Sequence, residues 1–191
     1  MSSFKLVIFG RQGAGKGTQA ALLVEKYGLT HISTGDMLRA EREAGTPLGV
    51  EAGQIMARGD LVPDEIIIGV AKNRLSDPQV RAAGFVLDGF PRTTDQATAL
   101  LEYLGDDSID AVIDLDVPLD EVKTRMMARG REDDTEEAIA QRLDLYEQQT
   151  RPVLEWFSEK GLLVTVNGLG TEDEVATRLT EVVDGLAAPN S

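Results

Sequence analysis

A glycine-rich stretch near the start of the chain has the residue types and spacing of a loop that binds phosphate. Residues 10–18 read Gly-Arg-Gln-Gly-Ala-Gly-Lys-Gly-Thr. The glycines let the backbone curl so that several N–H groups point at one anion, and Lys16 adds a full positive charge. The stretch follows an apolar run at 5–9 and precedes a helical pattern at 19–27. This strand–loop–helix order favours a P-loop over a plain glycine-rich turn, because Lys16 and Thr18 are in register.

Four arginines flank a predicted helix hairpin further along the chain: Arg125, Arg129, Arg131 and Arg142. The first two are four residues apart and therefore share one helix face. Guanidinium groups bind phosphate oxygens through paired hydrogen bonds, so the group favours a phosphate clamp opposite the P-loop. For any single arginine the alternative is a surface side chain paired with the nearby acids, which are Asp133, Asp134 and Glu137.

Another polar group is expected where the apolar run 85–87 ends. Asp88 closes that run, at the place where P-loop proteins carry a carboxylate that orients magnesium directly or through water. A turn cap is the alternative for Asp88. Arg92 follows in the same loop, and Arg39 lies on a helix opened by Asp36. Two groups of cations around one P-loop indicate two phosphorylated ligands, which suits phosphoryl transfer between nucleotides better than hydrolysis.

Five short apolar runs must position these residues, and we read them as parallel strands at 5–9, 30–32, 85–87, 111–115 and 162–166. Helical patterns separate the runs, which is typical of βαβ units. We therefore predict an α/β fold of the P-loop NTPase type, with a doubly wound five-stranded parallel sheet. Ligands bind such sheets beyond the carboxyl ends of the strands, and the P-loop, the Asp88 loop and the segments 33–36 and 167–170 all fall there.

Between the second and third strands lie about fifty residues, far more than one crossover helix needs. Helical stretches at 37–44, 48–58 and 63–75 indicate an insertion that could close over a ligand. After the fourth strand we predict a helix at 119–129, a brief turn, and a long helix at about 134–160, bent at Pro152.

Composition and net charge exclude some classes of partner and of catalytic chemistry. The chain has 191 residues, enough for one large domain, and a formal net charge of −14, which disfavours nucleic acid and anionic membranes as partners. Phosphorylated substrates would then need a local basic cluster. It has no cysteine, which excludes a thiol nucleophile and fits a cytoplasmic protein. A strand near residue 4 leaves us expecting no secretory leader. The single histidine, His31, is interpreted as structural.

On these motifs the whole chain resembles the adenylate kinase family, in a short-lid form. The landmarks are the P-loop, the segments 33–39 and 87–92 with Gln96, and Arg129, Asp133, Asp134 and Arg142. The resemblance implies one nucleoside monophosphate kinase domain over 1–191, with an AMP-binding insertion at 33–62 and a very short lid at 129–135. It also implies a monomer that converts ATP and AMP to two ADP with Mg²⁺, without nucleic acid or membrane partners.

The same resemblance assigns site residues. ATP would be held by Gly13, Ala14, Gly15, Lys16, Gly17, Thr18, Arg125, Arg129 and the backbone near Gly170. AMP would be held by Thr34, Gly35, Arg39, Asp60, Leu61, Val62, Gly89, Phe90, Pro91, Arg92 and Gln96. Arg131 and Arg142 would contact AMP or the transferring phosphate. Catalysis would rest on Lys16, Arg92, Arg125, Arg129, Arg131 and Arg142, and Asp88 would hold Mg²⁺ through water.

Gln12 and the very short lid depart from the family pattern, and alternatives stay open. Gln12 stands where the family usually has proline, and Gly17, as is normal for the family, replaces the hydroxyl that a standard P-loop offers magnesium. A UMP/CMP kinase on the same fold is the nearest alternative. Thr34 and Gln96 speak against it, because the resemblance implies alanine and asparagine at these places in relatives that select pyrimidines. A non-catalytic nucleotide-binding regulator is the other, although no guanine-reading Asn-Lys-x-Asp motif is present.

Overall fold

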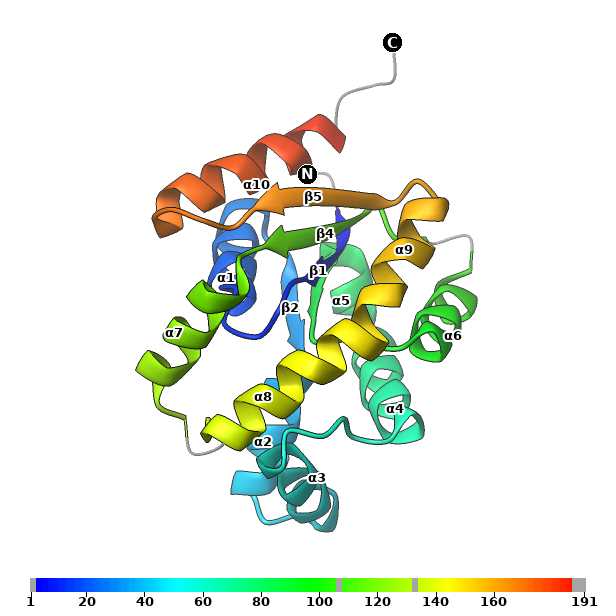
Figure 1. The fold of residues 1–191 in the computed structure, drawn as a ribbon. Coiled ribbons are helices and arrows are strands. Elements are labelled where there is room, and N and C mark those ends of the chain that lie inside the picture. The colour runs from blue at the N-terminus through cyan, green and yellow to red at the C-terminus, as the bar shows by residue number, and fades with distance from the viewer. Residues whose placement is uncertain (1–2, 106–107, 132–133, 187–191) are drawn as a thin grey trace.

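The computed structural model describes residues 3–105, 108–131 and 134–186. Five strands form one parallel sheet in the order β2-β3-β1-β4-β5 (Figure 1). Their bounds are β1 Lys5–Phe9, β2 Thr30–Ser33, β3 Phe85–Asp88, β4 Ala111–Asp116 and β5 Leu163–Asn167. The predicted doubly wound α/β fold and all five strands are confirmed, with ends that differ by one residue at most.

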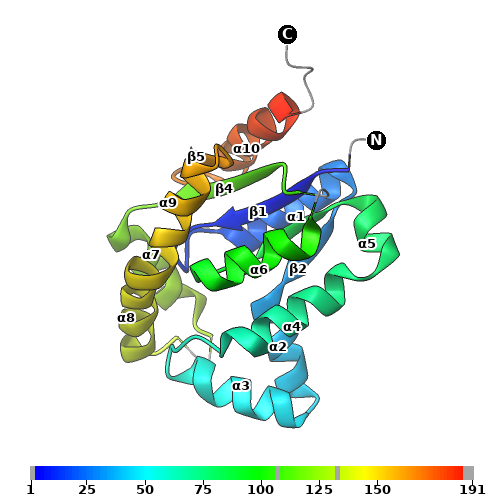
Figure 2. The same ribbon diagram turned by 90° about the vertical axis from the view of Figure 1, so that its right-hand side faces the viewer.

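The sheet is buried on both faces, because alternate strand residues enter two separate cores. Val7 and Phe9 pack with residues of α6 (Thr94–Leu104) and α9 (Arg151–Glu159). Leu6 and Ile8 pack on the other face with residues of α1 (Lys16–Tyr27), α7 (Leu119–Arg129) and α10 (Glu172–Leu186). Figure 2 shows α6 and α1 on opposite sides of β1. The two-sided cover holds the carboxyl ends of β1 and β3 rigidly.

The predicted insertion is helical, with two differences from expectation. Its helices are α2 Thr34–Glu43, α3 Pro47–Ala57 and α4 Asp64–Leu75, followed by α5 Pro78–Ala83. Helix α2 begins three residues earlier than predicted because the Ser33 hydroxyl caps it, accepting from the Asp36 N–H. Helix α5 was missed, although Asp77 before Pro78 is a cap signal, and the Asp77 carboxylate accepts from the Gln79 N–H.

The expectation of one long helix bent at Pro152 is corrected. Helix α8 spans Glu136–Leu145, a π-helical turn, η1, spans Tyr146–Thr150, and α9 follows. The change in winding comes before the proline, which stands in the first turn of α9, where a missing N–H costs nothing. Helix α7 matches its predicted bounds. Part of the predicted lid, residues 132–133, lies outside the described residues. Within the described residues no helix has the length and apolar character to cross a membrane.

Candidate active site

A cavity of about 510 Å³ opens beyond the carboxyl ends of β1 and β3. Seven basic side chains line it: Lys16, Arg39, Arg92, Arg125, Arg129, Arg131 and Arg142. Three acidic side chains line it too: Asp36, Asp60 and Asp88. A chain with a net charge of −14 thus carries a cationic cavity, which is the local basic cluster that phosphorylated ligands need.

The P-loop forms one wall of this cavity. Gly13 has φ +86°, and a Cβ there would lie 2.7 Å from the Val122 carbonyl oxygen of α7, so the loop closes only with glycine. Lys16 is the first residue of α1, and its Nζ donates to the carbonyl oxygens of Gly10 at 2.9 Å and Arg11 at 3.2 Å. These bonds hold the ammonium group inside the curve of the loop.

Lys16 is poised to exchange a proton. Burial lowers its pKa from the ordinary 10.5 to about 8, the charge of Asp88 opposes that fall, and Arg92 and Arg129 add to it. An anion entering the cavity would stabilise the charged form. Lys16 therefore has the charge and the surroundings to bind a phosphate group.

Asp88 has the features of a magnesium partner. Burial raises the pKa of its carboxyl, but nearby His31 and the charge of Lys16 outweigh burial and lower it below the usual value, so Asp88 is ionised at neutral pH. His31 Nε2 lies 3.5 Å from Asp88 Oδ2 and is buried without a closer hydrogen-bond partner. Gly17 stands next to the carboxylate, since a Cβ there would be in ordinary van der Waals contact with Oδ2, at 3.7 Å.

The donor set at this place fits Mg²⁺ rather than a metal caged by protein. Among the described residues, no group of three or more acidic, histidine or cysteine side chains could hold a metal. Mg²⁺ is commonly bound by one carboxylate together with phosphate oxygens and waters. Asp88, facing the cation-lined cavity beside the P-loop, can supply that carboxylate.

The arginines from the helix hairpin meet at Asp134. Arg129 donates to both oxygens of this carboxylate, at 2.9 and 2.8 Å, and Arg142 Nη1 donates to Oδ1 at 3.0 Å. Arg142 also donates to the Met56 carbonyl oxygen of α3 at 3.0 Å. Arg125 instead pairs with Glu121 at 2.7 Å. These arginines are therefore paired with acids and also line the cavity. The interpretation as a phosphate clamp and the interpretation as side chains paired with acids do not exclude each other.

A smaller cavity of about 40 Å³ lies between the insertion and the loop after β3. It is lined by Thr34, Gly35, Leu38, Met56, Asp60, Leu61, Val62, Ile67, Gly89, Arg92 and Gln96. Gly89 has φ +81°, and a Cβ there would be 3.1 Å from Thr34 Oγ1 and 3.2 Å from Arg92 Nη2. Arg92 is held to this loop by a 2.9 Å bond from its Nε to the Gly89 carbonyl oxygen. Both cavities share Arg92.

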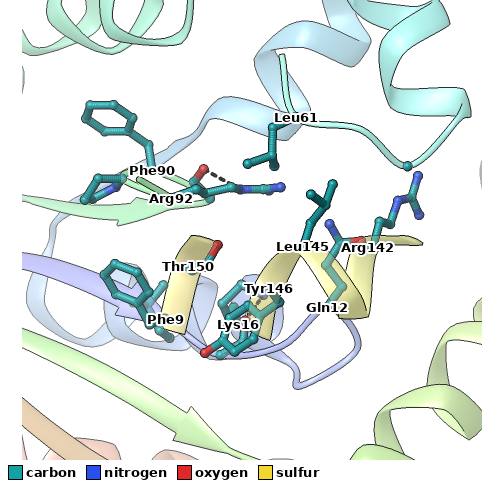
Figure 3. A pocket seen from close by; sticks show the side chains of 15 residues that line it. Phe9, Gln12, Lys16, Leu61, Phe90, Arg92, Arg142, Leu145, Tyr146 and Thr150 are labelled. Carbon is teal, nitrogen blue, oxygen red and sulfur yellow. Dashed lines mark hydrogen bonds between the residues drawn. The ribbon is translucent and has the colours of Figure 1, made fainter. Parts of the chain in front are cut away.

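A third cavity, also about 40 Å³, joins the P-loop to the π-helical turn (Figure 3). Phe9, Phe90, Pro91 and Tyr146 line it together with Lys16 and Arg92. Figure 3 shows Arg92 extended towards Leu61. Sequence reasoning missed Tyr146 and Thr150, because aromatic and small polar residues in a helix give no signal of a site.

Two predicted residues lie away from these cavities. Ala14 is buried, and its carbonyl oxygen accepts from Arg125 Nη1 at 3.5 Å. Gly170 follows β5, and a Cβ there would be 2.4 Å from Glu174 Oε2. Sequence reasoning also missed Arg11 and Asp64, which make the interactions described below. The remaining predicted residues line at least one of the three cavities.

Comparison with known proteins gives one consistent family. The family model described as "Adenylate kinase" matches residues 8–162. An adenylate kinase of Nocardia farcinica is 51% identical over 176 residues, covering 91% of this chain and 96% of that protein. One from Xylella fastidiosa is 48% identical over 182 residues, covering 92% and 96%. One from Mycobacteroides abscessus is 46% identical over 181 residues, covering 94% and 98%.

Proposed function

Because this chain belongs to the adenylate kinase family, and so converts ATP and AMP to two ADP, we propose that its cation-lined cavity holds both nucleotides end to end. The observation that carries this arrangement is the meeting of seven basic side chains in one cavity of about 510 Å³. They come from the P-loop, the insertion, the loop after β3 and the helix hairpin. A triphosphate and a monophosphate that face each other need more counter-charges than a single hydrolysed nucleotide does.

On the donor side, the P-loop residues 13–18 hold the ATP phosphates through backbone N–H groups and Lys16. Arg125 and Arg129 approach from α7. The backbone near Gly170 meets the adenine of ATP, at the end of β5. Asp88 would hold Mg²⁺ through water on this side of the cavity, and the ion would supply charge neutralisation for the ATP phosphates.

On the acceptor side, Arg39 and Arg92 hold the AMP phosphate, and the smaller cavity takes the base. Its lining by Thr34, Leu61, Val62 and Gln96 combines apolar surface with one amide, as a purine pocket requires. Gly35, Asp60, Gly89, Phe90 and Pro91 complete the backbone around AMP.

The reaction then needs little covalent chemistry from the protein. An oxygen of the AMP phosphate attacks the terminal phosphorus of ATP, and the bond from that phosphorus to the bridging oxygen breaks, leaving two ADP. Lys16, Arg131 and Arg142 stabilise the charge on the transferring group, and Arg92 orients the attacking phosphate. The same contacts serve the reverse reaction.

We assign closure to the insertion at 33–62 and the short lid at 129–135, both within one domain over 1–191. The insertion already contacts the lid side: Arg142 bonds Met56, and Gln141 Nε2 donates to Asp60 Oδ1 at 3.3 Å. Closure would exclude water, which otherwise accepts the phosphoryl group. A monomer in the cytoplasm, without nucleic-acid partners, stays a prediction.

The test is ADP disproportionation by the purified protein with Mg²⁺, followed by phosphoryl transfer from ATP to AMP, UMP, CMP and GMP. We expect ADP to yield ATP and AMP, and AMP to be the strongly preferred acceptor. Faster transfer to UMP or CMP would identify a pyrimidine kinase instead, and nucleotide binding without transfer would identify a regulator. A probe with two adenosines joined by a polyphosphate should bind once per chain and displace both ATP and AMP.

A further inference from the structure

The side chain of Gln96 is held in one orientation by two partners of opposite kind. Its Oε1 accepts from the Arg92 backbone N–H at 2.7 Å, and its Nε2 donates to Asp64 Oδ1 at 2.7 Å. Gln96 is 1% exposed, so water does not compete for these bonds. A backbone N–H can only donate and a carboxylate can only accept, so a rotated amide would face a donor with its nitrogen and an acceptor with its oxygen.

Asp64 is itself fixed in place. It is the first residue of α4, and its other carboxylate oxygen, Oδ2, accepts from the Thr93 hydroxyl at 2.8 Å. Thr93 caps α6, where its hydroxyl accepts from the Gln96 N–H at 3.2 Å. The carboxylate thus joins the starts of two helices and also lies at the positive end of α4.

Each amide atom of Gln96 keeps one further bonding capacity. The nitrogen has a second hydrogen and the oxygen a second lone pair, and Gln96 lines the small cavity. The fixed amide therefore offers one acceptor and one donor, which match the exocyclic amine and the neighbouring ring nitrogen of adenine. Hypoxanthine and guanine present the reverse pattern there, an oxygen acceptor and an N–H donor.

We propose that Asp64 is the positioning residue for base selectivity. By holding the Gln96 amide in the adenine-binding orientation, it makes the site reject 6-oxopurine nucleotides such as IMP. This inference rests on the proposed placement of AMP in the small cavity. Asp64 need not touch the nucleotide, because its effect passes through Gln96.

Wild-type protein already tests the proposal, with three acceptors that differ at the base edge. These are AMP, purine riboside 5′-monophosphate, which lacks the exocyclic group, and IMP. A fixed amide predicts that kcat/KM falls from AMP to the purine riboside nucleotide and again to IMP, because IMP meets two mismatched groups. An amide free to rotate would bind IMP better than the purine riboside nucleotide, and that order would overturn the proposal.

The variant Asp64→Asn tests the residue itself, because asparagine can donate to a rotated Gln96 oxygen and only the Arg92 N–H then opposes the rotation. We expect the ratio of kcat/KM for AMP to that for IMP to fall about tenfold, the change that about 1.4 kcal/mol represents, while KM for ATP stays near wild type. Glu65→Gln is the matched control, since it removes a charge from the same first turn of α4 at an exposed side chain. It should leave the ratio unchanged.

Gln96→Ala separates the role of Asp64 from the placement of AMP in the small cavity. If it lowers the AMP-to-IMP ratio while Asp64→Asn does not, the adenine site stands and the role of Asp64 is wrong. If Gln96→Ala leaves the ratio unchanged as well, the placement of AMP in the small cavity is wrong. Should Asp64→Asn fail to fold, the order of the three acceptors with wild-type protein still decides whether the Gln96 amide is fixed, which the proposed role of Asp64 requires.

Discussion

Arg11 of the P-loop binds Glu147 of the π-helical turn. The Arg11 Nη2 and Nε atoms lie 2.6 and 2.8 Å from Glu147 Oε1, and Nη1 donates to the Val117 carbonyl oxygen at 3.2 Å. The guanidinium carbon also lies 5.7 Å from the centre of the Tyr146 ring. The P-loop, which carries Gln12, is thus tied to the helix pair that carries Arg142.

Arg11→Ala should loosen the P-loop. We expect a loss of about 1–2 kcal/mol in the free energy of unfolding, since charge-assisted bonds are removed and Glu147 is partly screened by solvent. KM for ATP should rise as well. Urea unfolding and steady-state kinetics measure the two effects. Arg151→Ala is the control, because Arg151 pairs with the same Glu147 at 2.8 Å from an exposed position; a matching effect of Arg151→Ala would contradict a role for the loop.

The lowered pKa of Lys16 predicts that the protein takes up a proton when ATP binds. Burial lowers this pKa to about 8, and bound phosphate should raise it again. Near pH 8.5, ATP binding should therefore take up roughly half a proton or more, measurable by calorimetry in two buffers of different ionisation enthalpy. Lys16→Met should abolish the uptake and nearly all turnover, whereas Lys123→Met on α7 should change neither. No buffer dependence for wild type would mean that Lys16 is already charged in the free protein.

The same shift has a consequence for stability. Between pH 8 and 10.5 the unfolded chain holds a proton on Lys16 that the folded chain has released. Stability rises with pH wherever the unfolded state binds more protons. Lys16→Met should therefore lower the slope of the unfolding free energy against pH within this window, which chemical unfolding at several pH values measures.

Most of the fold could be predicted from the sequence, because the signals that mark strands and the P-loop are local. Apolar runs bounded by turn residues marked four of the five strands, and β2 was assigned mainly from its position along the chain. Glycines at fixed spacing marked the P-loop. Charged residues such as Arg39 and Arg142 were predicted through motif position and do line the cavity. The π-helical turn was not predicted, because Tyr146–Thr150 has the side-chain pattern of an ordinary helix.

Contacts between residues far apart in the sequence could not be predicted from local patterns. Arg11 and Glu147 are 136 residues apart, and Gln96 and Asp64 are 32 apart, so no spacing rule connects either pair. That Gln96 contacts the adenine of AMP stays a prediction. What fixes its orientation became visible only when α4 and α6 were placed side by side.

Asp134 predicts a loss of stability in acid. Its side chain is 0% exposed and binds both Arg129 and Arg142. Burial raises the pKa of this carboxyl, but the hydrogen bond and charge of Arg129 outweigh it, so the net pKa lies below 3.8. The ion pairs therefore stabilise the fold above that pH and are lost as the pH falls through the folded-state pKa.

Asp134→Asn should lower the unfolding free energy at pH 7 by about 1–3 kcal/mol and reduce its fall between pH 5 and pH 2. Chemical unfolding across that range measures both. Glu137→Gln, an exposed acid in the first turn of α8, is the control and should keep the wild-type slope. An unchanged slope for Asp134→Asn would show that other carboxyls govern acid unfolding.

Gly59 lies where the insertion contacts α8. We expect a substitution there to raise the KM for AMP and to leave the KM for ATP little changed. Gly59 has φ +82°, and a Cβ there would lie 2.6 Å from the Ala138 carbonyl oxygen. Gly59→Ala should push the insertion away from α8 and raise KM for AMP about tenfold or more, with KM for ATP little changed. Gly45→Ala is the matched control, because Gly45 has φ +69° but nothing within 4 Å of an added Cβ. It carries the same backbone strain without the collision, so an equal rise in KM for AMP would show that strain, not contact with α8, is responsible.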